Sequence, residues 1–371
     1  MIRSFKLLLC VIFFLQPWLL SGIIRFEVLV VLIASVFLLL TDKFRLSIVD
    51  LLYILFSGVI VLAYTIFHSE FDYSLFNVFI KLSILFLGAK LLVDYTSFDY
   101  SDLLIALRIV VSLSLIFYFL AVLVPIVRDI AMLLKGETYG LENKLEVYRL
   151  WFPSSAHTFH LGVFYFTVIA IQLLNKEKAI WIIPTLICAS ISSRSALMVG
   201  LVLVIVNAIQ KDRRLLILLV ASLSLFAFFF YDIVESSMSA RYALEPIINL
   251  VENGQLESKS TDTFQDKHLY MPNDKQIIFG DGRYFQESGK FYGGTDSGIM
   301  RPLLFGGMFF QGFYLVTMFL ILRKLYVGTI LSVAIVLSYY VMNVKAEFLI
   351  PGPHFALLSF YYFQRIKGNH L

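Results

Sequence analysis

Apolar segments long enough to cross a lipid bilayer follow one another along most of this 371-residue chain. A membrane-spanning helix needs about 17–25 predominantly apolar residues. Charged residues make up 15% of the chain and hydrophobic residues 59%, whereas a soluble domain is about a quarter charged. The pattern predicts an all-α polytopic membrane protein, folded as a single membrane domain over residues 1–371.

We expect about twelve spans of roughly twenty residues each. They cover residues 5–22, 24–40, 48–67, 75–93, 103–127, 158–174, 179–193, 195–210, 215–231, 302–322, 326–343 and 349–364. The N-terminal stretch has the basic end and apolar core of a signal peptide. A second apolar segment follows it at once and no A-x-A-like cleavage site is present, so we interpret it as a retained first helix.

Lysine and arginine in the short loops predict the orientation of the spans, because such residues gather on the cytoplasmic side. With a cytoplasmic N-terminus, one orientation places every basic cluster inside: Lys43 and Arg45, Lys176 and Lys178, Lys211, Arg213 and Arg214, Arg323 and Lys324, Arg365 and Lys367. Both termini are then cytoplasmic. The outer side receives a smaller segment, residues 128–157, and one large polar loop, residues 232–301.

Several other classes of site find no support in the sequence. The basic residues are scattered between apolar segments, which argues against a nucleic-acid partner. Cys10 and Cys188 both lie in apolar segments, so no disulfide is expected. There is no HExxH motif, no paired-cysteine spacing, no P-loop and no nucleophile elbow. We therefore expect neither a metal ion nor another cofactor.

Arginines on the outer side run against the positive-inside bias and are the first candidates for function. They are Arg149, Arg194, Arg241, Arg283 and Arg301. Arg194 stands out because it occupies a corner of one or two residues, in ISSRSALMVG, between two apolar helices. The alternative is an arginine that extends from a helix end to the water interface.

Arg194, Arg241 and Arg301 are expected at similar depth, where three guanidinium groups repel one another unless an anion lies among them. The planar fork of arginine suits phosphate, and an anionic lipid headgroup is the candidate at that depth. The alternative is separate pairing of each arginine with an acidic residue of the same loop.

Four further polar residues are candidates on the outer side. Asp296 is the acidic candidate in the glycine-rich strip YGGTDSGIMRPLLFGG, residues 292–307, with helix capping as its alternative. His157 begins an outer-facing span. A lone histidine in such a place is more often a structural hydrogen-bond donor than a catalytic base. Lys345 and Glu347 share a tight outer corner, where pairing with each other is the simpler interpretation.

Four short stretches resemble the bacterial O-antigen polymerases of the Wzy type, which are related to the O-antigen ligases. ISSRSALMVG is similar to the serine–arginine motif of both groups. RLWFPSSAHTFHLG, residues 149–162, resembles the arginine-containing lead into the central helices. GGTDSGIMRPLLFGGMFFQG, residues 293–312, and NVKAEFLIPG, residues 343–352, resemble the Asp-Ser-Gly strip and the Lys-x-Glu corner of the polymerases.

The resemblance implies a GT-C-like membrane glycosyltransferase at the periplasmic face of the bacterial inner membrane. Its substrates would be undecaprenyl-diphosphate-linked glycans, among membrane lipids, and a chain-length regulator is a candidate partner. Arg194, Arg241, Arg301 and Arg149 would hold the leaving diphosphate. Asp296 would be the first candidate for the catalytic base and His157 the second. Arg283, Lys345 and Glu347 would support the site.

Two other functions stay open. An O-antigen ligase, which transfers polymer to lipid A–core, would share the fold and the arginines, but ligases generally carry a histidine motif where this chain has TDSG. A lipid-linked oligosaccharide flippase predicts inverted halves, broken helices and charges at mid-membrane. Here the central helices look intact and the unusual charges gather on one side, which favours the polymerase.

Overall fold

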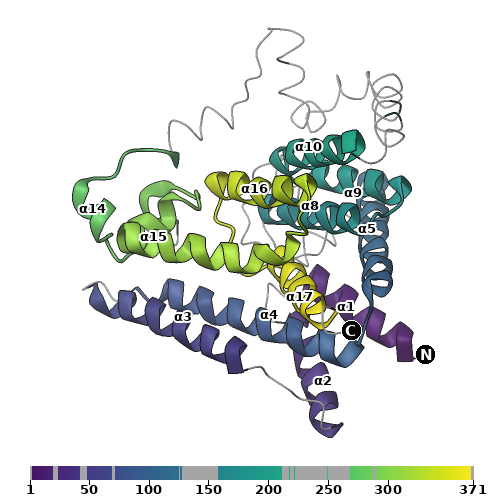
Figure 1. The fold of residues 1–371 in the computed structure, drawn as a ribbon, viewed down its shortest axis with the longest axis horizontal. Coiled ribbons are helices and arrows are strands. Elements are labelled where there is room, and N and C mark those ends of the chain that lie inside the picture. Colours follow the sequence, from purple (N-terminus) through teal and green to yellow (C-terminus); the bar gives the residue numbers. More distant parts are fainter. Residues whose placement is uncertain are drawn as a thin grey trace.

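The helices of the computed structural model follow the apolar segments of the sequence (Figure 1). The structure describes residues 2–19, 24–41, 48–68, 72–124, 126–127, 158–210, 268–286 and 290–368, with residues 217, 221 and 249 singly. Its helices are α1 (Ile2–Leu15), α2 (Phe26–Leu40), α3 (Ile48–Phe67), α4 (Ser74–Thr96), α5 (Tyr100–Leu123), α8 (Thr158–Leu174), α9 (Ala179–Ser192), α10 (Arg194–Gln210), α14 (Asp274–Ile278), α15 (Met300–Leu322), α16 (Ile330–Lys345) and α17 (Pro353–Gly368). The other described elements are the 3-10 turns η3 (Tyr292–Gly294) and η4 (Arg323–Leu325) and the strands β1 (Trp18–Leu19) and β2 (Ile24–Arg25).

A helix lies in each predicted span that falls within the described residues. The predicted span at 215–231 and the outer segment at 128–157 lie outside them, apart from residues 217 and 221. Four described helices, α3, α4, α5 and α15, are long and apolar enough to cross a membrane. The fold is that of a helical membrane protein.

Exposed apolar stripes mark the faces that such helices turn outward. On α3, Leu52, Phe56 and Val59 are each more than half exposed, and their spacing of three and four residues places them on one side of the helix. Ile330 and Leu337 do the same on α16. A soluble protein rarely leaves such stripes in contact with water, whereas a lipid bilayer covers them.

The helix in the first predicted span, residues 5–22, ends at Leu15, so this prediction is wrong for residues 16–19. The helix stops there because Pro17 follows closely, and a proline disfavours helical backbone at the residue before it. Gln16 accordingly adopts a positive φ of 46°. The chain then makes a two-residue ladder in which Trp18 pairs with Arg25, antiparallel, before α2 begins.

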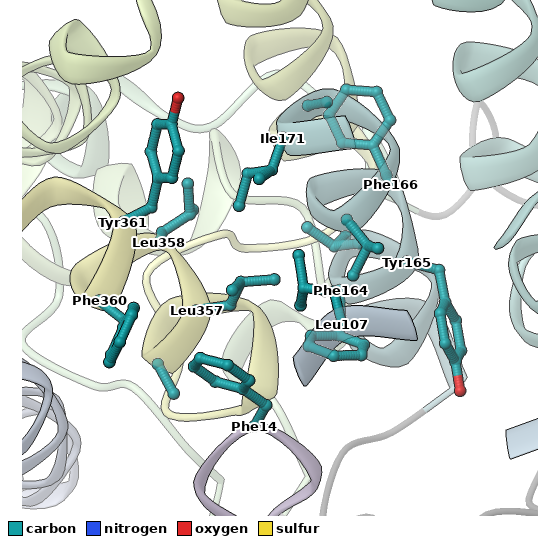
Figure 2. Close-up of a cluster of buried hydrophobic side chains, with 14 of the residues drawn as sticks. Phe14, Leu107, Phe164, Tyr165, Phe166, Ile171, Leu357, Leu358, Phe360 and Tyr361 are labelled. Carbon is teal, nitrogen blue, oxygen red and sulfur yellow. The ribbon is translucent and has the colours of Figure 1, made fainter. Parts of the chain in front are cut away.

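The C-terminal helix α17 lies at the centre of the packing and contacts α1, α4, α8 and α15. Figure 2 shows Leu357 and Phe360 of α17 beside Phe14 of α1 and Phe164 of α8. The rings of Phe14 and Phe360 meet edge to face at 5.3 Å. Since lipid is as apolar as leucine, close packing rather than escape from water holds such helices together.

Buried hydroxyl groups add polar links between the same helices. The Tyr165 hydroxyl of α8 donates to the Ser114 hydroxyl of α5 at 2.7 Å. The Tyr339 hydroxyl of α16 donates to Thr167 of α8, also at 2.7 Å. Such interhelical hydrogen bonds each contribute about 0.6 kcal/mol in membranes, so they fix which faces meet more than they set the overall stability.

Loops that were predicted to share one side of the membrane meet at one end of the structure, here called the basic end. The guanidinium of Arg3 bonds Asp102, at the start of α5. The Arg365 guanidinium donates to the carbonyl of Lys324 at 3.4 Å. The Lys367 ammonium donates to the hydroxyl of Ser97, beyond α4. The N-terminus, the α4–α5 turn and the ends of α15 and α17 therefore lie together.

Candidate functional site

The glycine-rich strip and the α16–α17 corner form one unit at the opposite end of the helices. The amide of Glu347 donates to the carbonyl of Asp296 at 2.9 Å. The Ser297 hydroxyl donates to the Val344 carbonyl at 2.6 Å. A Cβ atom on Gly298 would overlap Asn343, so glycine is required there for close approach. Two segments about fifty residues apart are thus joined by backbone contacts.

The corner that carries Arg194 packs against the same unit. Ser193 is extended, with φ −159° and ψ 125°, and Arg194 begins α10 immediately after it. The Lys345 ammonium donates to the Ser195 hydroxyl at 2.9 Å. A Cβ atom on Gly162 would overlap Ser193, so α8 also approaches this corner closely. Arg194 itself is partly exposed.

Arg301 and Glu347 form a buried ion pair within the unit. Nη1 of Arg301 lies 2.6 Å from Oε2 of Glu347, and both side chains are 2% exposed. The Tyr284 hydroxyl donates to the same carboxylate oxygen. The Arg301 guanidinium also lies over two aromatic rings, 4.0 Å from the centre of Tyr284 and 3.8 Å from the centre of Phe291.

The electrostatics of this pair are set by the loss of water. Burial raises the pKa of the Glu347 carboxyl, while Arg301 and the Tyr284 hydroxyl act in the opposite direction. A buried charge without a partner is costly, so each member holds the other in place. Arg301 therefore ties the start of α15 to the corner before α17.

Glu347 and Lys345 have different partners from the one that the sequence suggested. The simpler interpretation paired them with each other, but Glu347 meets Arg301 and Lys345 meets Ser195. The reason is local: α16 ends at Lys345, and Ala346 is extended with φ −152° and ψ 148°. The chain changes direction between the two residues and aims them at different elements.

Asp296 has a histidine beside it that the sequence did not single out. Nδ1 of His268 lies 3.3 Å from Oδ1 of Asp296, and the side chains are 23% and 45% exposed. The Thr295 hydroxyl donates to the His268 carbonyl at 3.0 Å, which fixes the two segments together. A carboxylate next to an imidazole can orient it as a proton acceptor. Only the fold brings these residues, 28 positions apart, into contact.

Helix α15 is broken near its start, and a glycine turn closes the break. Gly307 has a φ of 69° and a ψ of −168°, which interrupts the helix. The amides of Asp281 and Gly282 donate to the freed carbonyls of Leu304 and Phe305 at 2.7 and 2.9 Å. The stretch GDGRYF is thus a turn, and it supplies donors that a broken membrane helix needs.

The remaining candidates are placed as follows. Arg149, His157 and Arg241 lie outside the described residues. Arg283 lies within the glycine turn GDGRYF, where it is exposed. Among the residues that the structure describes, no group of three His, Cys, Asp or Glu side chains is arranged to hold a metal ion.

Comparison with protein-family models, with curated proteins and with solved structures found no match to this chain.

Proposed function

We propose that this chain is an O-antigen polymerase, a metal-independent glycosyltransferase that joins undecaprenyl-diphosphate-linked repeat units into polysaccharide. One observation carries the proposal. Three segments that resemble polymerase motifs, the Arg194 corner, the 293–301 strip and the Lys345–Glu347 corner, meet at one end of a helical membrane protein. They are widely separated in the sequence, so their meeting is not a trivial result of chain proximity.

The proposal includes an orientation. The motif segments lie away from the basic end, and the positive-inside bias assigns that basic end to the cytoplasm. The motifs would then face the periplasm, with about twelve spans in the inner membrane and both termini inside. This is the side on which lipid-linked repeat units are joined in the family that the sequence resembles.

In the proposed reaction, an acceptor hydroxyl oxygen bonds to the anomeric carbon of the donor's reducing-end sugar. The bond from that carbon to the diphosphate oxygen breaks, and the diphosphate leaves with the electron pair. Arg194 and Lys345, which flank Ser195, are the cations we assign to that leaving group. Arg241 and Arg149 stay in the proposal as further cations from outside the described residues.

Arg301 takes a different part from the one first expected. Its charge is paired with Glu347 and covered by Tyr284 and Phe291, so we assign it to positioning the strip. Asp296, with His268 beside it, is the partly exposed acid–base pair of the strip. We propose that this pair accepts the proton of the acceptor hydroxyl, with His157 as the other candidate base.

The ligase remains a second candidate because of one contact. The sequence favoured a polymerase partly because the strip lacks the histidine that ligases carry there. His268 lies against Asp296 in space, which weakens that distinction. The flippase gains one feature, the broken start of α15, but the motif residues still gather at one end of the helices.

A deletion strain tests these functions on a gel of its surface polysaccharide. Loss of a polymerase leaves lipid A–core carrying a single repeat unit. Loss of a ligase leaves the polymer attached to the carrier lipid. Loss of a flippase removes both the single-repeat product and the polymer. Complementation with Arg194→Ala should fail to restore chain extension, and Arg194→Lys should restore little because a bidentate contact is lost. Normal ladders with Arg194→Ala at wild-type protein levels would remove Arg194 from the site.

A further inference from the structure

An apolar cavity separates α15 from the helix pair α3 and α4. Its volume is about 100 Å³, and its walls come mainly from these three helices. All three are long and apolar enough to cross a membrane. Figure 1 shows α3 and α4 side by side, with α15 running over them. The cavity therefore lies among the candidate membrane spans.

The residues that line the cavity extend along the helices. Its lining runs from Tyr53 to Val61 on α3 and from Phe310 to Ile321 on α15. At 1.5 Å per residue, these stretches are about 12 and 16 Å long. A lining of this length matches a segment of an extended hydrocarbon chain.

One end of the cavity lies at the candidate functional site. Glu347 is among the lining residues, and hydrogen bonds join the α3–α4 turn to the loop that follows α14. Asp72 accepts from the amide of Tyr284 at 2.6 Å, and Nε2 of His68 lies 3.0 Å from the Phe279 carbonyl. At the other end of the pair, α4 packs against α17.

The lining is mainly hydrocarbon. Its polar groups are the carboxylate of Glu347 and the hydroxyl groups of Tyr53, Ser57, Ser83, Tyr314 and Thr317, and its other side chains are apolar. An engineered apolar cavity of about 150 Å³ stays dry and binds benzene. The bilayer around α3, α4 and α15 is the nearest source of a molecule that matches this lining.

We propose that this cavity holds part of the hydrocarbon chain of a membrane lipid, with the headgroup at the end where Glu347 meets Arg301. The chain follows the helices, and the lipid thereby reaches the candidate site from within the membrane. A polyprenyl carrier and a phospholipid offer the same chemistry to the cavity. Assignment to the carrier rests on the proposed function, but the presence of a chain does not.

Photolabelling of the full-length protein in nanodiscs tests this inference. The two probes are a polyprenyl phosphate and a phosphatidylglycerol, each with a photoreactive group in its chain. We expect label on peptides of α3, α4 and α15 that face the cavity. Val61→Phe fills the cavity at a residue that is 4% exposed and should reduce labelling about tenfold, which corresponds to about 1.4 kcal/mol.

Val59→Phe is the matched control, because the same change on the same helix falls at a residue that is 63% exposed. It should leave cavity labelling unchanged. Ser57→Phe, one turn away in the same lining, repeats the test if Val61→Phe does not fold. If unlabelled polyprenyl phosphate reduces the labelling and unlabelled phosphatidylglycerol does not, the chain in the cavity belongs to the carrier. The opposite result assigns the chain to a phospholipid.

Equal labelling of the wild type and both filled variants would overturn the inference, as would label confined to the outward faces of the helices. No sugar transfer is needed for labelling. The outcome of the labelling experiment is therefore independent of the outcome of the gel assay that tests the polymerase.

Discussion

The Arg301–Glu347 pair makes the most direct test at the scale of single residues. Glu347→Ala leaves the Arg301 guanidinium buried without its carboxylate. Breaking a buried ion pair in this way costs about 3–5 kcal/mol. We expect Glu347→Ala to lower the free energy of unfolding in detergent by that amount, measured from the denaturant dependence of a folded-state signal.

The double variant Arg301→Met with Glu347→Gln separates pairing from simple loss of contacts. It removes both charges, and the glutamine carbonyl can still accept from the Tyr284 hydroxyl. The double variant should lose much less stability than the sum of the losses in Arg301→Met and Glu347→Gln alone, because neither charge is left buried without a partner. If the single effects simply add, the two side chains do not depend on each other and the positioning role of Arg301 is lost.

Asp72 gives a pH dependence at the same scale. Burial alone would raise the pKa of its carboxyl, but hydrogen bonds from Ser74 and from the amides of Tyr284 and Phe285 outweigh it and lower the pKa. A lowered pKa stabilises the folded state at pH values above the unfolded-state pKa, about 3.9. That contribution is lost as the pH falls through the folded-state pKa.

We expect the wild type to be more stable than Asp72→Asn by a constant amount between about pH 5 and pH 8. The difference should begin to shrink on acidification below about pH 4 and should be lost as the pH falls through the folded-state pKa of Asp72. Unfolding midpoints of both proteins across this range measure it. Asp274→Asn, at an exposed residue in the first turn of α14, is the control for the loss of an acidic side chain elsewhere in the protein. A difference that does not shrink at all on acidification from pH 5 would mean that Asp72 acts through shape rather than charge.

At the scale of elements, two glycines of α15 should respond to alanine in opposite directions. Gly307 has a φ of 69°, and a Cβ atom there would overlap the Ile278 carbonyl. Gly312 lies further along α15, with nothing within 4 Å of an added Cβ atom. Gly307→Ala should destabilise by more than about 1 kcal/mol, whereas Gly312→Ala should stabilise by about 0.5–1 kcal/mol.

Thermal unfolding of the two variants, monitored by the elution of monodisperse protein, measures both effects. The pair is matched because residue type, substitution and helix are the same. Equal behaviour would mean that the break at Gly307 and the glycine turn docked on it are not needed for the native fold.

The positions of the helices could be predicted from the sequence because each membrane span is a long segment of apolar residues. The exceptions have local causes, such as the proline that ends α1 at Leu15. Side-chain partners could not be predicted in the same way. Nothing near Glu347 in the sequence points to Arg301 or Tyr284, and nothing near Asp296 points to His268, because each contact depends on how distant segments pack.

At the scale of the whole molecule, the sequence predicts which loops lie on the same side of the membrane. The contacts between loops at the two ends of the structure agree with that grouping. Positive charge indicates which loops share a side before any contact is known. Arg3, Lys324, Arg365 and Lys367 accordingly lie at one end. The orientation of the two ends can be measured in a membrane.

Single cysteines at the two ends supply that measurement. Met271 is 87% exposed on the loop before α14, and Tyr326 is 56% exposed beyond α15 at the basic end. Both native cysteines are buried, Cys10 at 0% and Cys188 at 3%, so they should give little background. A membrane-impermeant maleimide applied to spheroplasts should label Met271→Cys directly and Tyr326→Cys only after permeabilisation. The reverse pattern would place the Arg194 corner and the Asp296 strip in the cytoplasm, away from any periplasmic substrate, and the polymerase proposal would fall with the orientation.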